Sequence, residues 1–342
     1  MRAKDSQSSP DAAMTLDSVS RFRTASASSA ATGKVTLRVV AERHRWDALT
    51  AQAPQPHLPQ SFAYGAGKAA TGWPAQRIEF VRDGRAVAFA TVLQVRRLGI
   101  TLLNRVNRGP VFLDAEPDDD TIVGVYRALR RHHGHFWQGP LLIAPALPRG
   151  TGASRLLRHA GYLLRHERSW TSGRIDLTRS EDEIWRGLGS TFRNRVRNAE
   201  KSEATLDVAT GGAAYEWMLA RHREHVAAKG FSAVDSTMLR ALRAAAPETV
   251  VVFRMMLGEV PVAGMSVVSF GTICEYHIGW FGPEGRRLNA GNFLMWAVLR
   301  EMKRRGLAAF DVGGLKPGDG YTQFKQTMKP VEYELCGEWM SF

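Results

Sequence analysis

The sequence is poor in cysteine and contains no long apolar run. Its 342 residues include two cysteines, Cys274 and Cys336, which lie far apart and show no metal-ligand spacing. This scarcity argues against a disulfide scaffold and against a zinc site, and it favours a reducing compartment such as the cytoplasm. The best apolar stretch is interrupted by Arg254 and by a turn at Gly258, so it falls short of the roughly 18 residues of a membrane span.

Motifs for covalent catalysis are also absent from the sequence. There is no Gly-x-Ser-x-Gly elbow, and neither cysteine has a motif partner. His132, His133 and His135 lie around Gly134 at a predicted helix end, while His222 and His225 lack a third ligand in the sequence. We therefore expect no metal, no tightly bound cofactor and no covalent acyl-enzyme.

Acidic residues are too few to balance the basic ones. The chain has 46 lysines and arginines against 33 aspartates and glutamates, which gives a formal net charge of +13. This balance favours anionic partners such as phosphates, nucleic acid or a membrane surface, without specifying a fold. Much of the excess is concentrated in the stretches 186–201 and 286–305.

The first 36 residues have little apolar content and are rich in serine, alanine and threonine. They predict a disordered tail, and they contain no apolar core of a secretory signal. The remaining length is sufficient for two domains, because domains typically have about 100–200 residues. We expect an N-terminal domain over 37–170 and a C-terminal domain over 171–342.

The order of predicted elements in the first of these ranges occurs again about 170 residues later. Each copy begins with a hairpin, whose turn is marked by Asp83-Gly84 or by Gly258-Glu259. A third strand, a helix ending at a glycine, a strand, a short helix and a last strand follow in both copies. Apart from the short helices, the predicted segments are 77–95, 99–110, 121–132, 135–144 and 162–170, and then 251–270, 272–283, 291–305, 307–315 and 331–340.

Seven elements in matching order at a near-constant offset indicate a duplication. The match concerns the order of elements and not the identity of residues. The alternative is a single α/β domain that contains two unrelated hairpins.

The most informative stretch lies near the end of the chain. An apolar strand ending at Asp311 leads into Gly313-Gly314, and a loop then leads to a short predicted helix that presents Lys325. Glycines at a strand end allow a ligand to approach the backbone closely. A lysine beside that strand end could stabilise the oxyanion of a tetrahedral intermediate.

These motifs and the duplication resemble the FemAB-like aminoacyltransferases, which consist of two GNAT-like units. The resemblance covers about 60–342 and is most specific in a basic helix at 192–201, in 291–314 and in Phe324-Lys325. The first half contributes further matches at Gln60-Ser61-Phe62, Gly67-Lys68, Gly72-Trp73 and Asn107-Arg108-Gly109-Pro110.

The resemblance implies an α/β (α+β) fold with two tandem GNAT-like domains, each a mixed, largely antiparallel sheet flanked by helices. It also implies transfer of an acyl or aminoacyl group to an amine by direct attack. The donor would be acyl-CoA or aminoacyl-tRNA, and the acceptor would be a small or lipid-linked anion of the cell wall. The chain lacks the coiled-coil arm of some members, and it lacks the tyrosine that often follows a motif such as Lys229-Gly230-Phe231.

Catalytic roles fall on two residues near the C-terminus. The resemblance places Lys325 at the reaction centre, and Asp311 could act as a base or as a hydrogen-bond acceptor. The alternatives are a solvated surface lysine and a structural aspartate at a strand end.

The donor is expected at the loop 286–292, where GNAT enzymes grip a pyrophosphate with N–H groups at a helix N-terminus. Arg287 fits the first position of their pattern, whereas Ala290 and Asn292 replace small glycines. This degeneracy favours aminoacyl-tRNA over acyl-CoA. The predicted donor-binding residues are Arg287, Ala290, Gly291, Asn292, Gly313 and Gly314.

Acceptor phosphate is expected at Lys68 and Arg108, and at the pair Arg193 and Arg197, which lie four apart on a predicted helix. Each of these cations is also explained by an ordinary solvated surface.

Two functions of other classes stay open. A basic RNA-binding module would use the same charge, although the aromatic motifs of RNA-recognition domains are missing. A catalytically inactive GNAT-like scaffold is also compatible, because fold does not imply function. In each case we expect a monomer.

Overall fold

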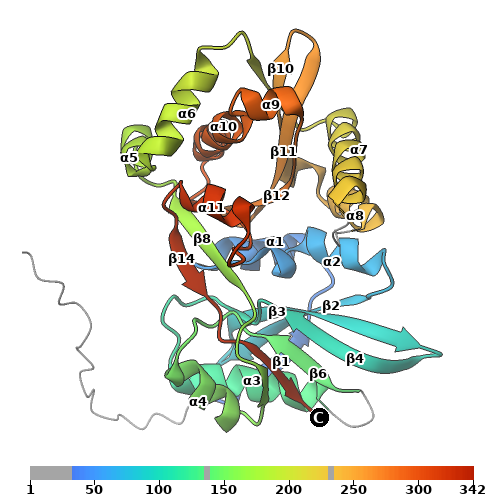
Figure 1. Ribbon diagram of the computed structural model, residues 1–342. Coiled ribbons are helices and arrows are strands. Elements are labelled where there is room, and N and C mark those ends of the chain that lie inside the picture. Colours follow the sequence, from blue (N-terminus) through green and yellow to red (C-terminus); the bar gives the residue numbers. More distant parts are fainter. Residues whose placement is uncertain (1–32, 135–138, 230–234) are drawn as a thin grey trace, which may run out of the picture. The chain divides into compact units, whose positions relative to one another are not determined.

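Two β-sheets with flanking helices make up residues 33–134, 139–229 and 235–342, the ranges that the structure, a computed structural model, describes (Figure 1). The tail predicted for the first residues lies almost entirely outside these ranges, as do His135, Gly230 and Phe231. From Lys34 onward the chain forms one compact unit.

The first sheet contains β1 (Thr36–Val39), β2 (Ala75–Arg82), β3 (Arg85–Arg97), β4 (Ile100–Asn107), β5 (Val111–Phe112), β6 (Leu141–Ala144), β7 (Leu163–His166) and β15 (Glu338–Ser341). Its strand order is β1-β2-β3-β4-β6-β15-β7, and β5 pairs with β3. The pair β4/β6 is parallel, and the other described pairs of neighbours are antiparallel.

The second sheet contains β8 (Thr171–Asp176), β9 (Thr205–Ala209), β10 (Val250–Leu257), β11 (Val260–Phe270), β12 (Ile273–Phe281), β13 (Ala309–Asp311) and β14 (Val331–Glu334). Its order is β14-β8-β13-β12-β11-β10-β9. Here β12/β13 is the parallel pair, and the other described neighbours are antiparallel.

The helices are α1 (Arg43–Gln52), α2 (Phe62–Ala69), α3 (Asp119–His133), α4 (Thr151–His159), α5 (Glu181–Gly187), α6 (Ser190–Glu200), α7 (Gly212–Lys229), α8 (Ser236–Ala245), α9 (Pro283–Arg287), α10 (Ala290–Arg304) and α11 (Gly320–Gln326), with short 3-10 turns at Leu58–Gln60 and Pro247–Thr249. Several begin at a side chain suited to the N-cap. The Ser61 hydroxyl accepts a hydrogen bond from the Tyr64 N–H, and Asp118 and Asp319 cap α3 and α11 in the same way. No helix among the described residues combines the length and apolar character needed to cross a membrane.

The two halves share a set of elements in the same order, as the sequence predicted. The hairpin β2–β3 corresponds to β10–β11, β4 to β12, α3 to α10, and β6 to β13. Asp83 and Gly84 both have positive φ, of 51° and 76°, as a two-residue hairpin turn requires. Gly306 has φ +82° and ends α10 as expected, whereas Gly134 has φ −108°. Gly134 is needed for lack of space and not for its φ, because the Cβ of any other residue would lie 2.7 Å from the Ser341 hydroxyl oxygen.

The last strand of each copy belongs to the sheet of the other copy. In the first sheet, β15 lies between β6 and β7, and in the second sheet β8 lies between β13 and β14. Since β8 follows the first copy along the chain and β15 follows the second, the two copies exchange equivalent strands. The chain therefore passes from one sheet to the other twice, between β7 and β8 and again between β14 and β15.

The strand predicted over 331–340 is therefore wrong in its extent. It is divided into β14, in the second sheet, and β15, in the first, so the residues of β15 lie outside the sheet of the expected C-terminal domain 171–342. The break falls at Gly337, which has φ +96° and where a Cβ would lie 2.4 Å from the His166 carbonyl oxygen. The strand predicted over 162–170 is also shorter than expected, because β7 ends at His166.

Apolar side chains cover both faces of each sheet. In the second sheet, α6 and α10 bury residues such as Phe192 and Leu294 on one face, and α7 and α8 bury Met218 and Leu239 on the other (Figure 1). In the first sheet, α3 and α4 pack on one face and α1 on the other. Helix α2 packs closely on α8, since a Cβ on Gly67 would lie 2.8 Å from the Met238 carbonyl oxygen.

Candidate active site

The parallel strands β12 and β13 separate after three pairs of residues. Ile273 lies opposite Ala309, and Glu275 opposite Asp311, but beyond Asp311 the chain turns toward β8, where the Val312 N–H bonds the Gly173 carbonyl. A gap in the strand pairing therefore opens beside Tyr276. Gly313, with φ +72°, stands at this point, and a Cβ there would lie 3.2 Å from the Tyr276 carbonyl oxygen and 3.6 Å from the Lys325 Nζ.

Lys325 places its ammonium group at this point of separation. The side chain comes from α11 and is 4% exposed, and its Nζ donates a hydrogen bond to the Gly314 carbonyl at 2.9 Å. The Nζ also lies 5.3 Å from the centre of the Tyr276 ring and 5.0 Å from that of Tyr321. Among the described residues, Gly314 provides the one hydrogen-bond acceptor to this nitrogen, so two N–H donors remain.

Burial lowers the pKa of Lys325 to about 8, although the negative charges of Glu275 and Asp311 favour its protonated form. The group is therefore still a cation at neutral pH. A desolvated cation with unused donors is the arrangement that stabilises a developing oxyanion. Its burial excludes the alternative of a solvated surface lysine, and the placement of Lys325 at a reaction centre stays a prediction.

Asp311 is surrounded by hydrogen-bond donors. Its carboxylate accepts bonds from the hydroxyls of Ser172 and Tyr333, from the Gly313 N–H at 2.9 Å and from the Arg174 Nε at 3.3 Å. A base would have to release one of these bonds to receive a proton. The geometry thus gives Asp311 a positioning role, in which it holds the turn at Gly313 beside Lys325.

Arg108 is committed to a buried ion pair that joins the two sheets. Its guanidinium donates to both oxygens of Glu275, at 2.9 and 3.3 Å, and lies 4.2 Å from the centre of the Trp170 ring. Burial raises the pKa of the Glu275 carboxyl, against the pull of Arg108. Arg108 is thus held in a fixed position, and its predicted contact with acceptor phosphate stays a prediction.

A basic cavity of about 420 Å³ lies next to this ion pair. Its wall includes Arg105, Arg108 and Arg168 together with Tyr64 and Trp170. Lys68 lies beside it, with its Nζ 6.0 Å from the centre of the Tyr64 ring. Among the described residues, neither Lys68 nor Arg168 has a carboxylate partner. Trp170 also contacts Gly314, since a Cβ there would lie 3.0 Å from its ring, so this wall of the cavity touches the residue whose carbonyl accepts the Lys325 hydrogen bond.

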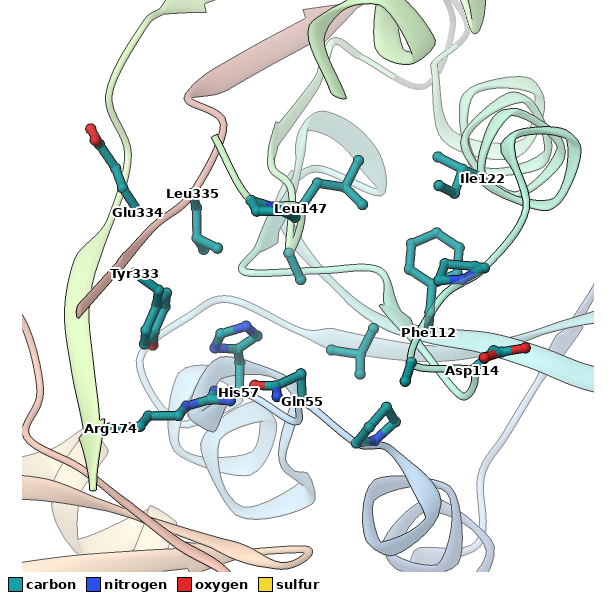
Figure 2. Close-up of a pocket in the computed structure, with 16 residues that line it drawn as sticks. Gln55, His57, Phe112, Asp114, Ile122, Leu147, Arg174, Tyr333, Glu334 and Leu335 are labelled. Carbon is teal, nitrogen blue, oxygen red and sulfur yellow. Dashed lines mark hydrogen bonds between the residues drawn. The ribbon is translucent and has the colours of Figure 1, made fainter. Parts of the chain in front are cut away.

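A second cavity, of about 440 Å³, lies on another side of the Asp311 network. Figure 2 shows His57 and Tyr333 at one side of this cavity and the apolar Phe112, Ile122 and Leu147 around the rest. Burial and the positive charges of Arg108 and Arg174 hold the pKa of His57 well below its usual value, so the imidazole is neutral. The Tyr333 hydroxyl bonds Asp311, so that this cavity and the Lys325 site share one polar network.

The residues predicted to bind the donor divide into two groups. Gly313 and Gly314 lie at Lys325, and Gly291 lies close by, since a Cβ there would be 3.3 Å from the Phe324 ring. Ala290 and Asn292 are buried at the same end of α10. Arg287 is exposed and pairs with Glu284, so it does not join this group.

The phosphate site predicted at Arg193 and Arg197 stays a prediction, and one of the two arginines has a structural role in addition. The Arg193 guanidinium donates to the carbonyl oxygens of Arg186 and Leu188 at 2.7 and 2.6 Å, and thereby caps the end of α5. Arg197 is exposed, bonds Asn194 and lies 5.6 Å from the centre of the Trp185 ring. The sequence shows that these arginines share a helix, but not that a neighbouring helix ends beside one of them.

Several residues of the site were missed in the sequence, namely Glu275, Trp170, Arg105 and Arg168. Glu275 carries a recognisable signal, because it is the one acidic residue in a largely apolar strand. The other three have no local signal, since their positions depend on how the two sheets meet. Within the described ranges, no group of three or more His, Cys, Asp or Glu side chains is arranged to hold a metal.

Residues 189–326 match the protein-family model described as an acetyltransferase (GNAT) domain. This range is less than half of the chain and extends from the residue before α6 to the end of α11, including Lys325. The match marks the second half as a GNAT-type acyltransferase domain, and the first half repeats the order of its elements. No protein of curated function matches the sequence.

Solved structures share this fold over nearly the whole chain. FemX matches with a TM-score of 0.75 and 16% identity, over 88% of this chain and 96% of that one. A tandem GNAT protein from the clavulanic acid biosynthesis pathway matches with 0.52 and 14%, over 90% and 98%. The C-terminal domain of a putative lysylphosphatidylglycerol synthetase from Agrobacterium fabrum matches with 0.53 and 13%, over 87% and 89%. The chain thus has a FemAB-like fold of tandem GNAT-like domains.

Proposed function

We propose that the protein transfers an aminoacyl or acyl group from an activated donor to an amine of an anionic acceptor of the cell wall or envelope. The observation that carries this proposal is the buried Lys325 ammonium, which has unused N–H donors where β12 and β13 separate. The fold, shared with FemX, supports the same reaction class. The reducing environment favoured by the cysteine content suits a cytoplasmic site, where such donors are made.

The reaction would proceed by direct attack. The nitrogen of the acceptor amine forms a bond to the donor carbonyl carbon, and the carbonyl oxygen becomes an oxyanion that the remaining Lys325 N–H groups stabilise. The carbon–oxygen bond of an aminoacyl ester, or the carbon–sulfur bond of a thioester, then breaks. The amine loses a proton, and the leaving oxygen or sulfur gains one. Asp311, whose lone pairs are occupied, holds Gly313 in place throughout.

The acceptor would place its anionic part in the basic cavity. Arg168 and Lys68, which have no carboxylate partner among the described residues, are suited to a diphosphate of a nucleotide-linked or lipid-linked precursor. The donor would enter at the N-terminal end of α10, beside Phe324. Aminoacyl-tRNA is favoured over acyl-CoA, because Ala290 and Asn292 are buried where a pyrophosphate loop needs small, open glycines.

The test supplies the full chain with acyl-CoA or with charged tRNA, each with a muropeptide amine, and follows products by mass spectrometry. We expect consumption of one donor and formation of an amide on the acceptor. Lys325→Met should remove turnover, and Lys329→Met, which changes an exposed lysine four residues away, should retain it. Consumption of neither donor across several acceptors would indicate an inactive scaffold. RNA binding without turnover would indicate a binding module.

A further inference from the structure

The tip of the β3–β4 hairpin presents aliphatic side chains to solvent. Leu98 is 93% exposed and Ile100 is 60% exposed, and Leu102 is also among the exposed apolar residues. The hairpin reaches out beyond the rest of its sheet (Figure 1). Ordinary folding does not explain this tip, because exposed leucine and isoleucine gain nothing from burial there.

The turn itself is unsuited to leucine. Leu98 and Gly99 have φ of 48° and 79°, which is the left-handed geometry of a two-residue hairpin turn. That geometry favours asparagine or aspartate in the first position, and leucine is strained there. The same chain uses Asp83-Gly84, with φ of 51° and 76°, in the neighbouring turn of its first sheet. Leu98 therefore stands where it weakens the fold, which points to a role outside folding.

The segment of sequence that contains the tip has basic residues but no acidic ones. From Arg85 to Leu113 the sequence contains no acidic residue, and it contains Arg85, Arg96, Arg97, Arg105 and Arg108. Arg96 and Arg97 immediately precede Leu98 and are exposed. Aliphatic side chains flanked by arginines suit the boundary between lipid headgroups and acyl chains.

We propose that the β3–β4 tip docks on a bilayer that contains anionic lipids, with Leu98 and Ile100 in the acyl boundary and Arg96 and Arg97 on the headgroups. An RNA partner is less suited, because single-stranded RNA is bound through aromatic stacking, and the tip is aliphatic. A protein partner is also less suited. A stable interface buries about 800 Å² on each side, and the three aliphatic side chains of the tip are too few to supply such an area. This docking goes beyond the acyl-transfer reaction and does not depend on it.

Strand β4 leads from the tip to the basic cavity. Ile100 and Arg105 lie five residues apart on this strand, a distance of about 17 Å at roughly 3.4 Å per residue. A docked tip would therefore hold the cavity close to the headgroup layer, within reach of a lipid-linked diphosphate. This consequence, unlike the docking itself, rests on the proposed function.

The experiment measures co-sedimentation of the full chain with vesicles of phosphatidylcholine alone or with added phosphatidylglycerol. We expect binding to the anionic vesicles that falls with added salt. Leu98→Asn should lower the partition coefficient about tenfold, because it removes one buried leucine from the acyl boundary. Arg96→Gln and Arg97→Gln should each lower it about fivefold.

Thermal unfolding of the same variants distinguishes docking from a structural role. Leu98→Asn introduces the residue that the turn favours, so its midpoint should equal or exceed that of the wild type. Asp83→Asn, in the matched turn, should change neither vesicle binding nor the midpoint. The proposal is overturned if the wild type ignores anionic vesicles, if Leu98→Asn binds them equally well, or if this variant unfolds at a lower temperature. Loss of RNA binding in Leu98→Asn, without vesicle binding by the wild type, would assign the tip to RNA.

Discussion

Lys325 carries a positive charge in a place where burial disfavours charge. A pKa lowered from 10.5 to about 8 corresponds to roughly 3 kcal/mol, since one pKa unit is about 1.4 kcal/mol. The folded state bears this free energy at neutral pH, while the unfolded chain does not. A destabilising group that persists beside a gap in the strand pairing is a sign of function.

Lys325→Met tests this separation of stability from activity. The substitution keeps much of the side-chain volume and removes the buried charge, so we expect the free energy of unfolding to stay equal or to rise. Transfer activity should fall by at least about 100-fold, the scale of losing one oxyanion donor. Urea denaturation and a product assay measure the two effects, and an active methionine variant would contradict the assignment.

The pH dependence of Lys325 has opposite signs for activity and for stability. Activity needs the ammonium form, so kcat/KM should decline as pH rises through about 8. Between pH 8 and 10.5 the unfolded chain still holds the proton that the folded protein has lost, so stability from this group rises with pH. Lys325→Arg should lose the alkaline limb if it is active. Equal unfolding pH profiles for wild type and Lys325→Met would contradict the pKa shift.

At the scale of elements, α6 shows how a basic helix can serve the fold. Its spacing of arginines fits a phosphate grip, but α5 ends so close to it that Arg193 bonds the last carbonyls of α5. These carbonyls carry the negative end of the helix dipole and have no partner within the helix. The Arg193 guanidinium therefore offsets the negative end of the α5 dipole.

Arg193→Gln should destabilise the protein, and Arg197→Gln should not. Loss of the charged bonds to the α5 carbonyls is expected to lower the free energy of unfolding by about 1–3 kcal/mol. Arg197 is exposed, so its substitution should stay within about 0.5 kcal/mol. Urea denaturation compares the two variants. A larger loss of acceptor binding than of stability in Arg193→Gln would restore the phosphate interpretation.

At the scale of the whole molecule, the exchanged strands make the two sheets interdependent. β15 comes from the extreme C-terminus and lies between β6 and β7, where Trp339 is fully buried. The N-terminal half therefore cannot complete its sheet without the residues of β15 (Glu338–Ser341). The Arg108–Glu275 pair adds a side-chain connection across the same junction.

Trp339→Ala should be strongly destabilising although it lies three residues from the end of the chain. Removing a fully buried tryptophan costs about 3–5 kcal/mol, whereas Phe342→Ala, at a residue 60% exposed, should change stability by less than about 0.5 kcal/mol. Hydrogen exchange should locate the loss of protection in β6 and β7 rather than in the second sheet. Protection lost only around β14 would contradict the strand exchange.

Local patterns made much of the fold predictable. Turn residues such as Asp83-Gly84 and caps such as Ser61 act within a few residues, so hairpins and helices could be predicted from the sequence. Strand partners could not, because nothing within 331–340 specifies which sheet each half joins. The Glu284–Arg287 pair, by contrast, is a local i,i+3 contact that the sequence itself indicates.

The sequence by itself determined the repeated order of elements, the glycines beside Asp311 and the presence of a lysine on the helix that follows them, because these depend on interactions between near neighbours. The tertiary structure alone decided which cations are available to a ligand. Arg108 is paired with Glu275, which lies 167 residues away and reaches it only in the folded protein, whereas Lys325 is desolvated beside a gap in the strand pairing with donors to spare. Burial and proximity set these differences, and both arise only when distant segments pack together.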